Sequence, residues 1–353
     1  MPLRRLFLPS SLVLALAAGA AVAPTAGLLP AAASTAQAGS LLPCDIYASV
    51  GAPCVAAHST VRALYTAYNG PLYQVKRASD GKTRNIRTLR AGGYANAAAQ
   101  NAFCAGTNCI ITVIYDQSPK RNNLTIEGPG QRGGRDVGAN AAALPITVGG
   151  HHVYGVYVTA GVGYRDNSTK GVAVGSSPQG EYMVASGRHV NNKCCFDYGN
   201  AETNGHDNGD GHMDAINFST KCFFSPCFGS GPRVQADLEN GLFAGANGSD
   251  TNNKGNSSAF VTAMVKSNGK TIYAIKGGNA QSGRLTTWYR GALPHRGGYA
   301  PLHQEGAIVL GTGGDNSKTS VGSFFEGVMT SGYPTAAADN AVQANIVSVR
   351  YGK

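Results

Sequence analysis

Short apolar runs separated by turn residues constrain the fold of this 353-residue chain more than any other feature. The runs are rich in β-branched and aromatic residues, and glycine, asparagine, aspartate or proline stands between them. There are 48 glycines, whereas only 14% of the residues are charged. This pattern predicts an all-β protein, an antiparallel β-sandwich or jelly roll. The clearest runs are 110–115, 153–158, 259–265, 271–275 and 306–311.

Two segments have helical rather than strand character. Residues 59–68 begin with Ser59 and Thr60, which are candidate N-caps, and residues 336–349 lie near the end of the chain. No internal repeat and no linker rich in proline and serine divides the sequence. We therefore expect a single β-sandwich domain over residues 39–353.

Residues 1–38 have the features of an export signal. Arg4 and Arg5 precede an apolar run, and small residues follow up to an A-x-A-type cleavage site at Ala36–Ala38. The two arginines also resemble part of a twin-arginine signal. The apolar run is too short and too rich in alanine for a membrane anchor, and no later segment approaches a membrane span. These features predict a secreted protein with no membrane partner.

Eight cysteines favour a disulfide-bonded protein, as expected in an oxidising compartment. Three pairs flank short loops, and their closure would leave the adjacent Cys194 and Cys195 for each other, with crossed pairing as the alternative. Two bonded neighbours close a strained ring, and strain of this kind is usually retained at functional sites. The three loop-closing pairs are Cys44–Cys54, Cys104–Cys109 and Cys222–Cys227.

The formal net charge of +10 does not indicate a nucleic-acid-binding protein, because the basic residues are scattered rather than gathered in a stripe with aromatics. The motif G-x-G-x-x-G occurs at 128–133, but more glycine and aspartate follow it, so we interpret it as a loop. The spacing of His206 and His212 in segment 204–214 fits neither a zinc site nor a calcium loop. We interpret that segment as a solvated turn, with a weak calcium site as the alternative.

Carboxylates provide the remaining candidate chemistry. The pattern of 234–240 indicates a strand that places Asp237 and Glu239 on one face and Leu238 on the other. Asp315 follows the apolar run 306–311 in a glycine-rich turn. A glycosidase needs two carboxyl groups, one as nucleophile and one as proton donor. The structural alternative is an exposed acidic pair and an ordinary turn aspartate.

At these residues the chain resembles the catalytic domain of the α-L-arabinofuranosidases of glycoside hydrolase family 54. The similarity extends from Pro43 to the region around Val349. The motifs that carry it are 43–47, 54–60, 114–118, 194–203, 237–240, 305–308, 313–316 and 326–334.

The resemblance implies a sandwich like that of legume lectins and β-glucanases, and a retaining, exo-acting enzyme without metal or organic cofactor. Glu239 would be the nucleophile and Asp315 the general acid/base, with their carboxyl groups about 5–5.5 Å apart. A Cys194–Cys195 disulfide would pack against the sugar. The other substrate-binding residues implied are Asp237, Asn240, Phe224, Leu242 and the backbone of Gly314.

Two departures from the family pattern stand out. Family members commonly carry a C-terminal arabinose-binding β-trefoil, and we expect none in this chain. Phe224 occupies the position of an aromatic wall that is tryptophan in other members.

We expect a monomer that releases terminal arabinofuranose from arabinan, arabinoxylan or related hemicellulose and pectin side chains. The alternatives are a non-catalytic, lectin-like sandwich and a β-glucanase-type endo-glycosidase.

Overall fold

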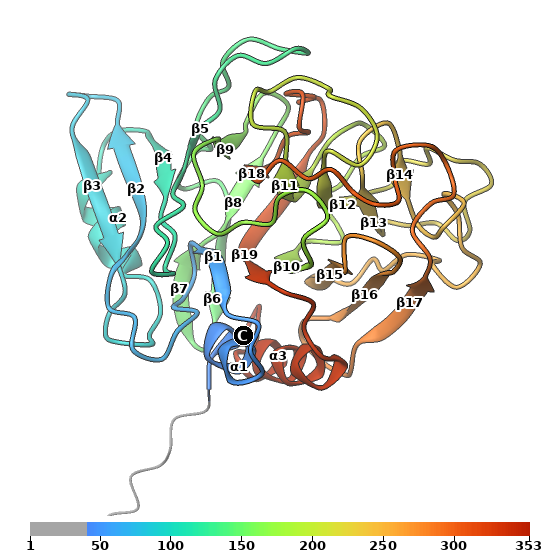
Figure 1. Ribbon diagram of the computed structural model, residues 1–353. Coiled ribbons are helices and arrows are strands. Elements are labelled where there is room, and N and C mark those ends of the chain that lie inside the picture. Colours follow the sequence, from blue (N-terminus) through green and yellow to red (C-terminus); the bar gives the residue numbers. More distant parts are fainter. Residues whose placement is uncertain (1–40) are drawn as a thin grey trace, which may run out of the picture. The chain divides into compact units, whose positions relative to one another are not determined.

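The computed structural model describes residues 41–353, and antiparallel strands are its main regular elements (Figure 1). The predicted export signal at 1–38 lies outside the described residues. One sheet has the order β1-β19-β10-β15-β16-β17, with β8 also paired to β19. Its strands are β1 Cys54–Ser59, β8 Val156–Val158, β10 Gln179–Ala185, β15 Val261–Ser267, β16 Tyr273–Asn279, β17 Thr286–Gly291 and β19 Gly322–Ser331.

The second large sheet has the order β14-β13-β12-β11-β18-β9-β5-β4-β2-β3, and β6 and β7 form a separate hairpin. Its strands are β2 Pro71–Arg77, β3 Thr83–Arg87, β4 Cys109–Ile114, β5 Leu124–Ile126, β9 Tyr164–Asp166, β11 Asp197–Ala201, β12 Asp214–Ser219, β13 Arg233–Asp237, β14 Leu242–Phe243 and β18 Ala307–Leu310. The remaining elements are β6 Pro145–Val148, β7 His151–Tyr154, α1 Pro43–Ser49, α2 Ala97–Phe103 and α3 Ala336–Ser348.

The two large sheets pack face to face, so the prediction of an all-β sandwich is confirmed. Along β12, Ile216 and Phe218 belong to the main core between the sheets, while Ala215 belongs to a small apolar cluster on the other face. Asp237 is the register partner of Ala215, so its side chain also lies on that outer face. The outer face of the ten-stranded sheet is therefore where polar side chains are available for function.

Several predicted elements need correction. The predicted helix at 59–68 is absent, because its backbone N–H groups bond to other segments: Ala63 donates to Gly93 O and Leu64 to the Gln117 side chain. The run 153–158 forms two strands, with β7 paired to β6 and β8 paired to β19. The C-terminal helix is present as α3, capped by the Thr335 hydroxyl.

Buried ion pairs anchor elements that are distant in sequence. The Arg62 guanidinium donates two hydrogen bonds, of 2.5 and 2.7 Å, to the Glu326 carboxylate on β19. Asp339 on α3 accepts from Lys266 and Lys276, at 2.6 and 2.7 Å, and so ties the helix to β15 and β16. Each of these buried carboxylates faces at least one cation, which compensates for its removal from water.

The eight cysteines form four disulfides, which correspond to the local pairing rather than the crossed one. The bonds are Cys44–Cys54, Cys104–Cys109, Cys194–Cys195 and Cys222–Cys227. Cys44 on α1 and Cys54 at the start of β1 are both buried in the main core. That disulfide therefore joins a helix to the sandwich, whereas Cys194–Cys195 joins only two neighbours.

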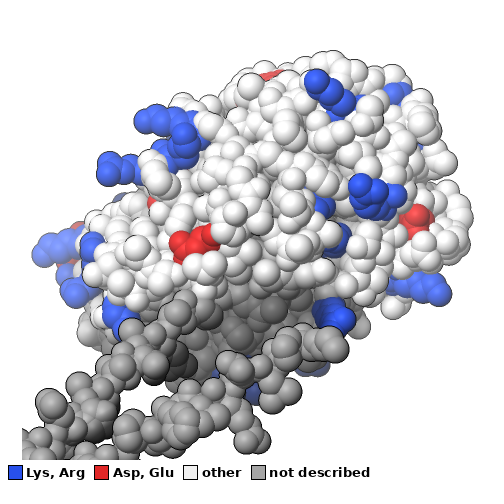
Figure 2. Space-filling view, turned by 60° about the horizontal axis from the view of Figure 1, so that its bottom comes forward, with Lys and Arg blue, Asp and Glu red and all other residues white. Residues whose placement is uncertain are grey.

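No helix among residues 41–353 is long and apolar enough to cross a membrane. On the face shown in Figure 2, lysine and arginine side chains stand singly or in small groups and form no continuous stripe. This distribution agrees with the scattered basic residues of the sequence.

Candidate active site

A pocket of about 250 Å³ lies on the outer side of the ten-stranded sheet, where β13 ends and β14 begins, near the turn at 313–317. It brings together residues that are more than 180 positions apart in the sequence. The lining residues are Arg132, Cys194, Cys195, Glu202, Asp207, Met213, Phe223, Asp237, Glu239, Asn240, Gly241, Leu242, Gly313, Gly314, Asp315 and Ser317. All the predicted site residues except Phe224 are among them.

Glu239 reaches this pocket from a turn and not, as predicted, from a strand. β13 ends at Asp237, and Glu239 and Asn240 both have positive φ, 62° and 52°. Non-glycine residues seldom adopt this conformation, and it persists where surrounding contacts hold it. Here the Glu239 N–H donates to Asp237 Oδ1 at 3.1 Å, and the Glu239 carbonyl accepts from Tyr299 at 3.0 Å. The turn therefore directs both Asp237 and Glu239 into the pocket.

Glu239 is only 5% exposed, and its two carboxyl oxygens have different surroundings. Oε1 accepts from the backbone N–H of Asn208 at 2.7 Å, whereas buried Oε2 is left without a donor. Burial, followed by the neighbouring carboxyls of Glu202 and Asp207, raises the pKa of Glu239 to about 12. A proton is therefore held at or beside this carboxyl at neutral pH.

Asp315 also lines the pocket, and it lies in the predicted glycine-rich turn after β18. Its Oδ1 accepts from the backbone and hydroxyl of Ser317, at 2.9 and 2.6 Å. Its Oδ2 accepts from Arg132 Nε at 3.2 Å. Arg132 comes from the 128–133 loop, so this loop contributes the one basic side chain that lines the pocket.

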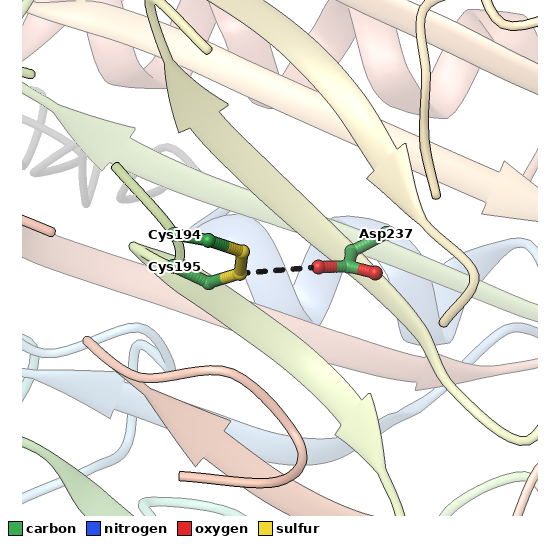
Figure 3. Close-up of side chains that lie close together, drawn as sticks. All are labelled: Cys194, Cys195 and Asp237. Carbon is green, nitrogen blue, oxygen red and sulfur yellow. Dashed lines mark hydrogen bonds between the residues drawn. A yellow bond between two sulfur atoms is a disulfide. The ribbon is translucent and has the colours of Figure 1, made fainter. Parts of the chain in front are cut away.

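The Cys194–Cys195 disulfide faces Asp237 across the pocket floor (Figure 3). Cys195 Sγ lies 3.6 Å from Asp237 Oδ2. A disulfide sulfur has no proton to donate, so a hydrogen bond here requires protonated Asp237. Burial raises the pKa of Asp237 to about 7, and Asp197 behind it has a side-chain hydrogen bond to Asp237. The three side chains in Figure 3 are close enough to hold a cation, but bonded sulfurs are not the thiolates that bind metals.

The two predicted aromatic and apolar contacts have different outcomes. Leu242 lines the pocket as predicted. Phe224 lies behind the lining: its ring is 4.8 Å from that of Phe243, and the Arg296 guanidinium is 4.3 Å from its centroid. Its neighbour Phe223, 49% exposed, lines the pocket instead. The Cys222–Cys227 loop thus presents one ring to the pocket and packs the other against the sandwich.

Five of the polar or aromatic lining residues were not predicted from the sequence: Arg132, Glu202, Asp207, Phe223 and Ser317. Glu202 lies in the segment 194–203, one of the motifs that carry the family resemblance, and this motif could have identified it. Asp207 lies in segment 204–214, which is more than a solvated turn because it also supplies the Asn208 N–H to Glu239. Local sequence carried no signal for Arg132, because only folding brings its loop to Asp315.

A sandwich that gathers carboxyl groups from distant segments into one small pocket has the elements of the glycoside hydrolase class. Residues 43–352 match the family model described as α-L-arabinofuranosidase B, catalytic, and the chain belongs to this family. A probable α-L-arabinofuranosidase B of Aspergillus terreus is 56% identical over 318 residues, 88% of this chain and 62% of that relative. The chain therefore spans less than two thirds of the length of this relative.

Two solved structures are similar to the chain at 49% identity and a TM-score of 0.86, covering 88% of this chain and 66% of theirs. One is a family 54 α-L-arabinofuranosidase soaked with a cyclic sulfate inhibitor. The other is an arabinofuranosidase complexed with arabinofuranosyl-α-1,2-xylobiose. The resemblance to glycoside hydrolase family 54 is thus confirmed.

Proposed function

We propose that the chain is a secreted, retaining, exo-acting α-L-arabinofuranosidase. The observation that carries this proposal is one pocket lined by Glu239, Asp315 and the Cys194–Cys195 disulfide. Its volume of about 250 Å³ is just below the range of about 300–1,000 Å³ for small-molecule sites, as expected for one terminal sugar unit. The family membership and the complex of a similar enzyme with arabinofuranosyl-xylobiose support the choice of sugar.

In this proposal Glu239 attacks the anomeric carbon as a carboxylate, while Asp315 protonates the departing oxygen. A glycosyl ester with Glu239 results. Asp315 then takes a proton from water, the water oxygen attacks the anomeric carbon, and the bond to Glu239 breaks. Two displacements retain the anomeric configuration. Arg132 contacts one Asp315 oxygen and so holds the carboxyl at the wall of the pocket. From this position Asp315 would reach the oxygen of the leaving group.

Six further features of the pocket lining would bind the sugar. The disulfide forms an apolar plate, Asp237 and Asn240 offer hydrogen bonds to hydroxyls, and the Gly314 backbone lies open to the pocket. Leu242 and Phe223 provide apolar walls, so we propose Phe223 in the role predicted for Phe224. Four disulfides support export, because such bonds persist in oxidising environments.

The deciding experiment is hydrolysis of p-nitrophenyl α-L-arabinofuranoside, with the anomer of the first product read by NMR. We expect wild type to release arabinose with retention. Glu239→Gln should lose at least about 10⁴-fold in kcat, and Asp315→Asn about 10²- to 10⁴-fold. Binding of arabinan without hydrolysis would favour the lectin-like alternative, and oligosaccharides released from β-glucan would favour the endo-glycosidase. Near-full activity of Glu239→Gln would refute the nucleophile assignment.

A further inference from the structure

Glu202, which follows β11 directly, is a pocket carboxyl that the proposed chemistry does not use. It is only 1% exposed, and its Oε2 is buried without a donor. A Cβ on Gly314 would lie 1.7 Å from that oxygen, so the carboxyl fills the space under Gly314. The nearby Arg165 partly opposes the rise in the pKa of Glu202 but forms no ion pair with this carboxyl among the described residues, because its guanidinium bonds to the backbone carbonyls of Glu202 and Gly314 and to Glu127.

The Glu202 carboxyl meets the carboxyl of Glu239. Both side chains line the pocket, and the Oε2 atoms of both are buried without a donor among the described residues. After burial, a side-chain hydrogen bond between the two carboxyls raises the pKa of Glu239 and opposes the rise in the pKa of Glu202. Ionised carboxylates can only accept hydrogen bonds, so this contact requires a proton between the two groups. Two buried carboxyls in contact cannot both ionise readily, and protons leave such a pair in two separated steps.

This contact poses a problem for the proposed chemistry. Burial and the carboxyl neighbours favour the protonated form of Glu239, yet only a carboxylate can act as the nucleophile. Some group must hold the proton while Glu239 attacks. Glu202 is a carboxyl neighbour of Glu239, is more buried than the half-buried Asp207, and, unlike Asp315, does not protonate the leaving group in the proposed chemistry.

We propose that Glu202 and Glu239 share one proton, and that Glu202 holds it while Glu239 attacks the sugar. The O–H bond of Glu239 breaks as the O–H bond of Glu202 forms, so the pair keeps one proton and one negative charge. Glu239 then forms its bond to the anomeric carbon, and Asp315 gives its own proton to the leaving oxygen. When water releases the sugar, Glu239 is again a carboxylate and shares the Glu202 proton. This inference rests on the assignment of Glu239 in the proposed function.

Charged groups from several elements face this pair. Asp207 lies beside Glu239 on the 204–214 segment, and Asp237 precedes Glu239 at the end of β13. Asp315 lines the same pocket, and its charge acts on Glu202. The cations are Arg132, which contacts Asp315, and Arg165 on β9, which lies behind Glu202. Five carboxyls thus line a pocket with one lining cation, an imbalance that favours retention of a proton by the most buried pair.

The shared proton can be detected without substrate. Infrared difference spectra between wild type and Glu202→Gln at neutral pH should show loss of one carboxylic acid C=O band, because the amide introduced at position 202 donates to an ionised Glu239. A difference spectrum that shows only loss of a carboxylate band would overturn the proposal. This readout is independent of catalysis, so it separates failure of this inference from failure of the proposed function.

Kinetics tests the role of Glu202 in the reaction. Glu202→Ala removes the proton acceptor, so we expect kcat to fall about 10- to 100-fold, the factor for one hydrogen bond to a charged group. The acid limb of its kcat/KM profile should rise by about one pH unit or more, because buried Glu239 then ionises alone. Glu202→Gln should lose less activity and keep its acid limb near that of wild type, because its amide donor favours the Glu239 carboxylate.

Asp214→Asn is the matched control. Asp214 is also a fully buried carboxyl of the ten-stranded sheet, but it faces Glu181 between the sheets and does not line the pocket. We expect its kcat/KM profile to match that of wild type. An unchanged profile for Glu202→Ala, or an acid limb lowered by a unit in Glu202→Gln, would show that Glu202 has only a structural role or is ionised in the free enzyme. If Glu202→Ala does not fold, Glu202→Gln and the infrared measurement still decide.

Discussion

Buried carboxyl groups occur in two regions of this molecule, and their partners differ. Between elements of the sandwich, Glu326 pairs with Arg62, and Asp339 with Lys266 and Lys276. In the pocket, Glu202, Asp237 and Glu239 are equally buried, but none forms an ion pair among the described residues. The ion pairs of Glu326 and Asp339 join elements of the fold, whereas the three unpaired pocket carboxyls have raised pKa values suited to proton chemistry.

The largest expected effect is on the structural side of this comparison. Glu326→Gln leaves the Arg62 guanidinium buried without its counter-charge, which costs about 3–5 kcal/mol of unfolding free energy. Denaturant unfolding should show this loss, while kcat per folded molecule stays near wild type. A loss below about 1 kcal/mol would mean that the pair does not anchor β19.

Stability should also depend on pH through the buried acids whose pKa values are raised. Burial raises the pKa of Asp214 and Asp237 to about 7 and that of Glu127 to about 8. A raised folded-state pKa means that the stability contribution is fully present below pH about 4 and is lost as pH rises through 7–8. We expect the unfolding free energy to fall by roughly a few kcal/mol between pH 5 and 8.

The same pH series on Asp214→Asn provides the check, since an amide cannot titrate. Its curve should be flatter than that of wild type over this window. A wild-type stability that rises steadily from pH 5 to 8 would contradict the assignment of neutral acids to the pocket and its surroundings.

The Cys194–Cys195 and Cys44–Cys54 disulfides should also differ in role, and we expect their removal to have effects of intermediate size. Replacing both Cys194 and Cys195 with serine should raise KM about tenfold, because the apolar plate under the sugar is lost, with little change in Tm. Replacing both Cys44 and Cys54 should do the opposite: it opens a loop of sequence separation 10 and costs about 2–3 kcal/mol of stability. Equal effects of the two double variants on Tm would argue against a binding role for the adjacent pair.

The smallest expected effect is the stability change in Glu239→Gln. The carboxyl of Glu239 holds or shares a proton when buried, so a neutral amide of the same shape should be tolerated. We expect the unfolding free energy to stay within about 1 kcal/mol of wild type, even though activity is lost. Thermal unfolding measures this directly, and a loss comparable to that of Glu326→Gln would remove the distinction between the two regions.

The sequence predicted a substantial part of this arrangement. Alternating apolar runs indicated the sandwich, and they also placed β4, β15, β16 and β18 to within a few residues. The helical reading of 59–68 was wrong because side-chain pattern does not reveal that Ala63 and Leu64 donate to Gly93 and Gln117. The prediction of one strand over 234–240 was also wrong. The turn at Glu239 depends on hydrogen bonds to Asp237 and Tyr299, which the apolar pattern does not reveal.

The sequence by itself thus determined the fold class, favoured the local disulfide loops over crossed pairing and identified Asp237, Glu239 and Asp315 as the candidate carboxyls, because these depend on periodicity, short separations and motifs. Only the tertiary structure decided that Phe223 and not Phe224 faces the pocket, that Arg132 reaches Asp315, and that Glu202 meets Glu239. Those contacts join segments up to 183 positions apart. The raised pKa values of the pocket carboxyls come mainly from burial, and burial depends on how the whole chain packs rather than on any one segment.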